Sequence, residues 1–293
     1  MAKRPKPASA PRAAQAADAT VSVAGTILRV IGTIFLILLV TGLLFLCIFA
    51  YYVKNCLSTD LDVQLSDFTV SLSSSILYED ADGNWQNLTN LSSTENRVWV
   101  DYADIPKDME HAAVAIEDKR FYKHKGVDWY RTTGAFINMF LSMKNDFGGS
   151  TITQQLAKNL FPRDTVRNRG RLVRNAKLVT SKLKEWITAL KLEYNYTKEE
   201  IAAMYLNTVE YGSNAYGIKS AALTFFNKEP HELNVQEAAV LVGVVNAPSR
   251  YSPVRNYDNA LARRNLVISR MEDAGAITRK QRDSLSALPI VLN

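Results

Sequence analysis

The chain has 293 residues, of which 47% are hydrophobic and 22% charged, so it can bury a full core in one large domain or two small ones. Its net charge of +6 suggests an anionic partner, such as nucleic acid, anionic lipid or a phosphorylated substrate. The chain has only two cysteines, Cys47 and Cys56, which are too few for a disulfide framework or a zinc site. Its three histidines also lack the spacing of metal ligands.

The N-terminal part of the chain changes composition sharply near residue 26. Met1 to Thr20 is basic and rich in Ala and Pro, which predicts a disordered tail over residues 1–26. Val30 to Val53 carries no charged residue and exceeds the roughly 20 residues that cross a bilayer, which predicts a transmembrane signal-anchor helix over residues 27–53. A buried core helix or a cleaved signal fits less well, since a signal has only roughly 7–15 residues in its apolar region.

The charges that flank this apolar segment predict its orientation. Arg29 and the basic tail precede it, whereas Asp60 and Asp62 follow it. Because positive charge is retained on the cytoplasmic side, we expect a single-pass protein with a cytoplasmic N-terminus and all later residues outside.

Two segments of different character follow. Residues 54–104 read as an irregular linker with β character, in which Asp82-Gly83 predicts a turn between two strands. Residues 105–293 read as one mainly helical domain, since apolar residues recur there at helical spacing. Helices are expected around Met109–Ile116, Trp129–Lys144, Leu183–Leu192, Glu199–Leu206 and Glu237–Val245. The last is expected to be buried because it is apolar nearly all round, and the second carries a wide apolar face made by Trp129, Phe136, Ile137, Phe140 and Leu141.

The first stretch that could carry chemistry is VAIEDKRFYKHKG, Val114 to Gly126. It places two adjacent carboxylates, Glu117 and Asp118, at the end of an apolar run, with His124 nearby. Partial desolvation beside an apolar segment makes a carboxylate a more competent base near neutral pH. From the acidic pair alone, an exposed helix end is the simpler interpretation.

The second stretch is GGSTITQQLAKN, Gly148 to Asn159. After two glycines, hydroxyl and amide side chains crowd together, and Lys158 lies about one helical turn beyond Gln154 and Gln155. Such a run can bind a polyoxygenated ligand, and the lysine suits phosphate. A Ser or Thr helix cap followed by a polar helix face explains the same residues without a ligand.

The third feature is a basic tract from Gln154 to Glu193. It holds ten Lys and Arg against three acids, and a solvated charge run is its ordinary interpretation. Nucleic acid is disfavoured, because the tract lacks the interleaved aromatic residues of stacking platforms and is expected outside the membrane. A pyrophosphate-bearing lipid suits both charge and location. Within the tract, Ser181 to Lys184 matches the S-x-x-K pattern of acyl-serine enzymes by accident, since no S-D-N or K-T-G follows.

Taken together, these stretches resemble the family 51 glycosyltransferases, the peptidoglycan polymerase domains of class A penicillin-binding proteins and their monofunctional relatives. The first stretch matches E-D-x-x-F-x-x-H-x-G, and the second matches G-x-S-T-x-T-Q-Q-x-x-K-N. SKLKEWITALKLE resembles R-K-x-x-E, with Lys182 and Glu185 in place but Ser181 where the family has Arg. MYLNTVEYGSNAYGIKSAA and EAAVLVGVVNAPSRYSP match the last two blocks.

The resemblance implies a fold and a reaction. The fold would be mainly α, a lysozyme-like two-lobed helical domain with a cleft, after a single transmembrane helix and a short β-like linker. The reaction would join lipid II into β-1,4-linked glycan strands, with inversion at the anomeric carbon and release of polyprenyl pyrophosphate. The apolar face of Trp129–Lys144 would belong to the lobe that dips into the membrane. A transpeptidase domain is expected beyond residue 293 by analogy.

The resemblance also assigns roles to individual residues. Glu117 would be the general base, and Glu185 would organise the donor side or a divalent cation. Lys158 would bind pyrophosphate, helped by Arg163, Arg167 and Arg169. Other residues of the substrate site would be Asp118, Phe121, His124, Thr151, Gln155, Asn159 and Lys182, of which Phe121 and His124 would shape the site rather than react. The charge of the absent Arg at Ser181 would have to come from Lys182, Lys184 or Lys177.

The resemblance implies no essential cofactor, and it leaves a divalent cation, Mg²⁺ or Mn²⁺, open. Expected partners are lipid II, the growing lipid-linked glycan, the membrane, and proteins of the divisome or elongation machinery, but no nucleic acid. The expected location is the bacterial cytoplasmic (inner) membrane, with the catalytic domain on the periplasmic or outer side. Two alternatives stay open: a lysozyme-like lytic enzyme, and a catalytically weak scaffold of wall assembly.

Overall fold

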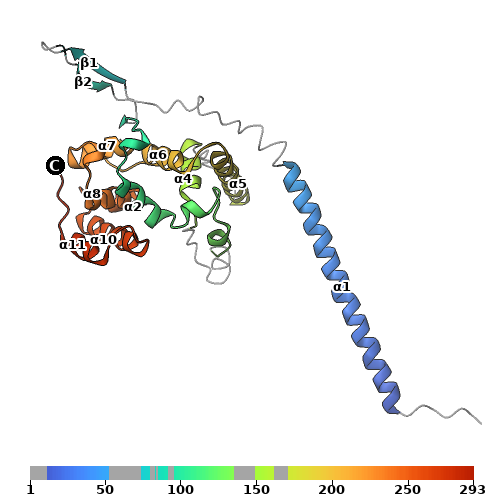
Figure 1. Ribbon diagram of the computed structural model, residues 1–293. Coiled ribbons are helices and arrows are strands. Elements are labelled where there is room, and N and C mark those ends of the chain that lie inside the picture. Colours follow the sequence, from blue (N-terminus) through green and yellow to red (C-terminus); the bar gives the residue numbers. More distant parts are fainter. Residues whose placement is uncertain are drawn as a thin grey trace, which may run out of the picture. The chain divides into compact units, whose positions relative to one another are not determined.

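The computed structural model describes residues 12–52, 74–79, 83, 85–91, 96–134, 149–161 and 171–293. The chain divides into two compact units, Met1–Asp62 and Val63–Asn293 (Figure 1). Most of the apolar face predicted within Trp129–Lys144 lies outside the described residues. So do three of the predicted phosphate-binding residues, Arg163, Arg167 and Arg169.

Helix α1, Arg12–Tyr52, is longer than the predicted membrane span. Its segment Leu28–Ile48 has 21 residues and a mean hydropathy of 2.8, so it is long and apolar enough to cross a bilayer. Residues 12–26, for which the sequence predicts disorder, are helical in this structure. Extending an existing helix avoids the cost of nucleation, and this segment is rich in the strongest helix former, with Ala13, Ala14, Ala16, Ala17 and Ala19.

The second unit is mainly helical, as predicted. Its strands and 3₁₀ turns are β1 Ser74–Glu79, β2 Trp85–Leu91, β3 Asn96–Arg97, η4 Tyr102–Asp104, η5 Phe121–Lys123, β4 Ala215–Tyr216 and η6 Pro230–Glu232. Its helices are α2 Lys107–Glu117, α4 Ile152–Leu160, α5 Arg171–Asn195, α6 Lys198–Thr208, α7 Ile218–Phe226, α8 Val235–Val245, α9 Pro248–Tyr251, α10 Tyr257–Asp273 and α11 Arg279–Ala287.

The helices that matter for the site form two groups. In one group, α2, α8 and α10 pack on one another, and in the other α4 packs against both α5 and α6 (Figure 1). Small residues allow the close approach within the first group, since Ala112 and Ala113 of α2 and Ala238 and Ala239 of α8 are buried. The prediction that Glu237–Val245 is a buried helix is confirmed, because Ala238 to Val244 of α8 are all buried.

Short strands connect the remaining segments. Strands β1 and β2 form an antiparallel hairpin in which Ser74 faces Leu91 and Glu79 faces Trp85, with Gly83 between them at a φ of 83°. The predicted pair of strands is therefore present. Beyond the hairpin, the buried Asn207 of α6 holds the incoming chain, because its side chain exchanges hydrogen bonds with the backbone N–H and carbonyl of Val100 at 2.9 and 2.8 Å.

The buried tyrosine Tyr211 makes the stability of this unit sensitive to alkaline pH. Burial raises the pKa of Tyr211 far above its usual value of about 10, while its hydroxyl donates to the carbonyl of Leu206 at 3.2 Å. Below pH of about 10 both the folded and the unfolded state keep the proton. Above it only the unfolded state ionises, so the free energy of unfolding falls by up to about 1.4 kcal/mol per pH unit.

We therefore expect Tyr211→Phe to make the alkaline loss of stability shallower. At pH 8 the variant should be less stable by about 1 kcal/mol, the contribution of one hydrogen bond. Between pH 10 and pH 11, roughly the first unit above the usual tyrosine pKa, it should lose less stability than the wild type. Urea unfolding of the whole chain in detergent at each pH measures both effects. The control is Tyr194→Phe, which alters a tyrosine that is 90% exposed, and equal slopes in the two variants would contradict the prediction.

Candidate functional site

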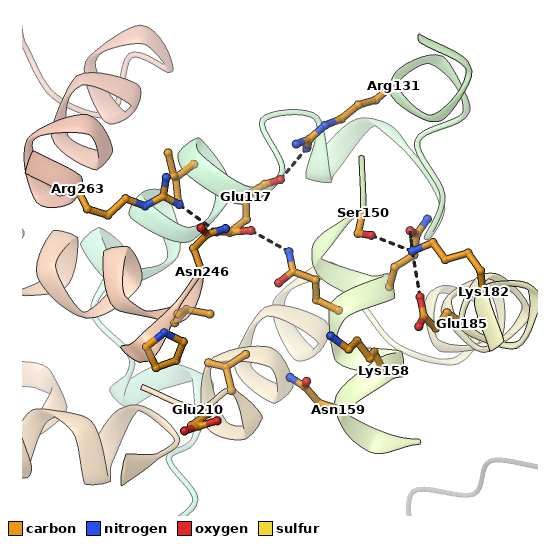
Figure 2. A pocket seen from close by; sticks show the side chains of 16 residues that line it. Glu117, Arg131, Ser150, Lys158, Asn159, Lys182, Glu185, Glu210, Asn246 and Arg263 are labelled. Carbon is orange, nitrogen blue, oxygen red and sulfur yellow. Dashed lines mark hydrogen bonds and ion pairs between the residues drawn. The ribbon is translucent and has the colours of Figure 1, made fainter. Parts of the chain in front are cut away.

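A polar pocket of about 560 Å³ lies where the two groups of helices meet (Figure 2). Both carboxylates to which the resemblance gave catalytic roles line it. The lining residues predicted from the sequence are Glu117, Gln155, Lys158, Asn159, Lys182 and Glu185. The pocket is completed by Ile116, Arg131, Ser150, Gln154, Val209, Glu210, Val245, Asn246, Pro248 and Arg263.

Glu117 is the last residue of α2, and groups from other parts of the fold hold it. Gln155 of α4 donates from Nε2 to Glu117 Oε2 at 2.8 Å, and Arg131 donates to the Glu117 backbone carbonyl at 2.7 Å. Tyr205 of α6 orients Gln155, since its hydroxyl donates to Gln155 Oε1 at 3.3 Å. Burial, and then the nearby charge of Glu117, raises the pKa of Tyr205 well above its usual value, so this hydroxyl keeps its proton.

Asp118, the next residue, points into the protein and is only 1% exposed. Its Oδ2 lies 2.9 Å from His124 Nε2 and accepts the backbone N–H of Ile152 at 3.0 Å. Phe121, in the same motif, is fully buried in the core. The resemblance implied that Asp118, Phe121 and His124 belong to the substrate site. The structure buries all three side chains outside the pocket lining, where they pack beneath the residues that form it.

Thr151 begins α4 as its N-cap and is likewise fully buried. Its hydroxyl accepts the backbone N–H of Gln154 at 3.1 Å and donates to the carbonyl of Gly126 at 2.6 Å. The structure therefore shows the capping role that the sequence left open for Thr151, whose side chain lies outside the pocket lining. The substrate contact that the resemblance implied stays a prediction. Because its one proton is already donated to Gly126, the Thr151 hydroxyl has no donor left for a ligand.

Gly126 makes the closest approach between this loop and α5. Its φ is +81°, and a Cβ there would lie 2.6 Å from the carbonyl oxygen of Ala189 and 3.1 Å from the backbone nitrogen of Leu190. Only glycine fits such a contact without a shift of the backbone. Gly126 thus links the N-terminus of α4 to the helix that carries Glu185.

Lys182 and Glu185 form the wall of the pocket on α5. The ammonium of Lys182 lies 2.9 Å from Glu185 Oε2, 2.8 Å from Ser150 Oγ and 3.3 Å from Gln154 Oε1. Lys182 therefore brings a positive charge to the block in which Ser181 replaces the family Arg. Lys184 is exposed and outside the lining, and the side chain of Lys177 lies outside the described part of the chain.

Lys158 and Asn159 project from α4 on the same side of the pocket and are exposed (Figure 2). Lys158 lies about one turn beyond Gln154 and Gln155, as predicted from the spacing. The pocket lining thus holds four cationic side chains and three carboxylates, an excess of positive charge that suits an anionic, oxygen-rich ligand. The cations are Arg131, Lys158, Lys182 and Arg263, and the carboxylates are Glu117, Glu185 and Glu210.

A divalent cation fits poorly at Glu185. Among the residues that the structure describes, no group of three or more His, Cys, Asp or Glu side chains could hold a metal ion. The ammonium of Lys182 already compensates the charge of the Glu185 carboxylate at 2.9 Å. A cation placed there would be repelled by it.

Four polar or charged lining residues, Arg131, Glu210, Asn246 and Arg263, received no role in the reasoning from sequence. Arg131 falls in a segment that reads as an apolar helix, and Arg263 reads as a solvated charge on a polar helix. Asn246 lies within a block that matched the family but carried no role. Only Glu210 and Asn246 offered a signal, since both lie in matched blocks, whereas Arg131 and Arg263 reach the pocket through tertiary packing.

Comparisons with known proteins identify a matching family and several relatives. The family model described as Transglycosylase matches residues 84–272. Penicillin-binding protein 1F of Bacillus subtilis (strain 168) is 41% identical over 188 residues, which cover 64% of this chain and 25% of the relative. Penicillin-binding protein 1A of Aquifex aeolicus (strain VF5) is 37% identical over 198 residues, covering 68% and 26%, and that of Escherichia coli (strain K12) is 39% identical over 189 residues, covering 64% and 21%.

The chain therefore spans about a quarter of the length of these curated relatives. Among solved structures, a crystal structure of penicillin-binding protein 1A from Haemophilus influenzae aligns with a TM-score of 0.39 and 22% identity. That alignment covers 76% of this chain and 21% of the other.

The contact of Gly126 with α5 generates a stability prediction. In Gly126→Ala, the left-handed backbone costs about 1–2 kcal/mol and the steric overlap with Ala189 costs about 1–3 kcal/mol more. The matched control is Gly275→Ala, because Gly275 also has a positive φ of 77° but a Cβ there meets nothing within 4 Å. Chemical unfolding of the whole chain should show a clearly larger loss for Gly126→Ala. Equal losses would mean that the close contact contributes nothing.

Proposed function

The chain belongs to the transglycosylase family, the family 51 glycosyltransferases, and from this we propose that it is a membrane-anchored peptidoglycan glycosyltransferase. It would polymerise lipid II into β-1,4-linked glycan strands for cell wall synthesis. One observation carries the proposal: Glu117 and Glu185 line a single pocket with the ammonium groups of Lys158 and Lys182. A base and a cationic site for diphosphate are the two parts that this reaction requires.

In the proposed reaction, Glu117 is the general base. The O–H bond of the attacking sugar 4-hydroxyl breaks, and its proton passes to Glu117 while the oxygen bonds to the anomeric carbon of the donor. The bond from that carbon to the pyrophosphate breaks at the same time, and its electron pair leaves on the phosphate oxygen. A single displacement of this kind inverts the configuration at the anomeric carbon. The hydrogen bond from Gln155 supports this role, because it fixes the direction of the carboxylate.

The leaving group is already a stable anion, so the pocket needs to supply positive charge rather than an acid. Lys158 would bind the pyrophosphate as a point charge, and Asn159 would donate a hydrogen bond to sugar or phosphate oxygens. Lys182 would complete the cationic side, held in place by Glu185. This pairing makes Glu185 an organiser of the donor side. No step of the mechanism uses a metal ion, although a divalent cation carried by the pyrophosphate substrate stays open.

The apolar segment Leu28–Ile48 would anchor the protein in the cytoplasmic membrane. The basic residues ahead of it support a cytoplasmic N-terminus, which would place the pocket on the outer side, where lipid II is available. The membrane, lipid II and the growing lipid-linked glycan would then be its partners. Proteins of the divisome or elongation machinery are further candidates.

A lytic enzyme that cleaves finished peptidoglycan would also use a glutamate near a sugar. Such an enzyme has no need of the lysines that line this pocket or of a bilayer anchor, so polymerisation fits better. Incubating the whole chain separately with lipid II and with purified sacculi distinguishes the two, since only lipid II should be consumed. Cleavage of sacculi without strand formation would contradict the proposal.

The base assignment predicts that Glu117→Gln lowers the polymerisation rate by at least about 100-fold, because a general base typically contributes about 10²–10⁴. Binding of lipid II should stay measurable, since the amide keeps the shape of the side chain. Fluorescent lipid II and gel separation of the glycan strands measure the rate, and a separate binding assay checks affinity. The control is Glu199→Gln, which alters an exposed residue in the first turn of α6. Wild-type strand formation by Glu117→Gln would refute the assignment.

The phosphate assignment predicts that Lys158→Ala lowers kcat/KM by about 10- to 100-fold, the loss of one charge-assisted hydrogen bond. The remaining activity should depend less on salt concentration than that of the wild type, because one ionic contact is gone. Initial rates at increasing salt test both effects. Lys184→Ala is the matched control, since Lys184 is an exposed lysine outside the pocket lining. An unchanged kcat/KM in Lys158→Ala would contradict the assignment.

A further inference from the structure

We propose that Arg263 is a positioning residue for the base: its guanidinium compensates the enclosed oxygen of Glu117 and so directs the other oxygen to the substrate. This inference rests on the proposed function, because it assumes that Glu117 takes the proton. Arg263 lies on α10, far in the sequence from the motif that carries Glu117. It nevertheless reaches the same pocket (Figure 2).

The two oxygens of Glu117 have different surroundings. Oε2 accepts the hydrogen bond from Gln155 and keeps lone-pair capacity for a second donor. Oε1 is enclosed and, among the described residues, has no hydrogen-bond donor. A carboxylate oxygen cut off from water is costly unless a positive charge compensates it. The nearest such charge is Arg263, whose Nη2 lies 3.8 Å from Oε1.

The distance of 3.8 Å defines the kind of interaction. It is too long for a hydrogen bond and short enough for a strong coulombic attraction between partly buried groups. Both side chains are largely shielded, with 13% exposed for Arg263 and 11% for Glu117, so water screens the pair only weakly. Arg263 can therefore fix the plane of the carboxylate without occupying the oxygen that must accept the proton.

The fold holds Arg263 in this position from two sides. On α8, Gly243 leaves room for the arginine stem, because a Cβ there would lie 3.2 Å from Arg263 Cγ. At the end of α9, the ring of Tyr251 faces the guanidinium, with 5.3 Å between the ring centroid and Arg263 Cζ. These contacts restrict an otherwise flexible side chain, which is what positioning of a partner requires.

The neighbouring arginine shows that this placement is specific. Arg264 is fully buried, burial lowers its pKa, and it donates to Asn265 Oδ1 at 2.7 Å and to the carbonyl of Ser286 at 3.2 Å. It thus connects α10 to the end of α11. Two adjacent arginines therefore serve different parts of the molecule, and only Arg263 belongs to the pocket lining.

The test is steady-state polymerisation of lipid II by the whole chain in detergent. Arg263→Ala should lower kcat by about 10- to 100-fold, the cost of a misplaced catalytic group, with KM nearly unchanged. Arg263→Lys, which keeps the charge, should recover part of the loss. Guanidinium at millimolar concentration should also restore activity to Arg263→Ala, whereas urea, its neutral isostere, should not. Arg270→Ala is the matched control, since Arg270 is an exposed arginine on the same helix, paired with Asp273.

The outcomes separate this inference from the proposed function. If the wild type makes no strands, or if Glu117→Gln makes them normally, the proposed function fails and the inference falls with it. If those two results hold but Arg263→Ala keeps the wild-type kcat, only the inference is overturned. It is also overturned if the activity lost in Arg263→Ala is restored neither by Arg263→Lys nor by guanidinium, because arginine then serves the fold alone. A thermal melt of each variant accompanies the kinetics.

Discussion

One oxygen atom, Oδ2 of Asp118, joins three segments of the chain at the centre of this domain. It lies 2.9 Å from the ring of His124 and accepts the first backbone N–H of α4, so the end of α2, the loop after it and the start of α4 are held together. Because Asp118 turns inward at the point where α2 ends, the residue before it, Glu117, faces the pocket. A buried acid outside the pocket lining thus determines where its neighbour points.

The rest of the site depends on how closely α5 approaches this junction. Gly126 lets the loop lie against the backbone at Ala189, while Thr151 binds the carbonyl of the same glycine. Lys182 on α5 then contacts Ser150 at the start of α4. Acidic and basic groups from distant segments are thereby brought around one cavity. This arrangement is typical of sites that orient a charged substrate and leave little reorganisation for the reaction itself.

Much of this could be predicted from the sequence, and the failures have physical reasons. The helical spacing of apolar residues was sufficient to predict α2 and α8. The order of the motifs was sufficient to predict that Glu117 shares one site with Lys158, Lys182 and Glu185. A motif cannot say which of its polar residues face a ligand and which satisfy the backbone, so it does not indicate that the hydroxyl of Thr151 is buried as a helix cap. Arg263 went unnoticed because a helical arginine that enters a pocket has the same local pattern as one in water. Arg263 reaches the pocket because Gly243 of α8 leaves space for its stem, and the packing of the two helices, not the sequence pattern, shows this space.

The hydroxyl of Tyr205 has an effect beyond its own contact. It stays protonated, so it can donate to Gln155 Oε1, and this contact favours the arrangement in which the amide turns its oxygen toward α6 and its NH₂ group toward Glu117. Were the amide reversed, its oxygen would face the Glu117 carboxylate, which can only accept hydrogen bonds, and the two oxygens would repel each other. The direction of the Glu117 carboxylate thus depends in part on a buried hydroxyl outside the pocket lining.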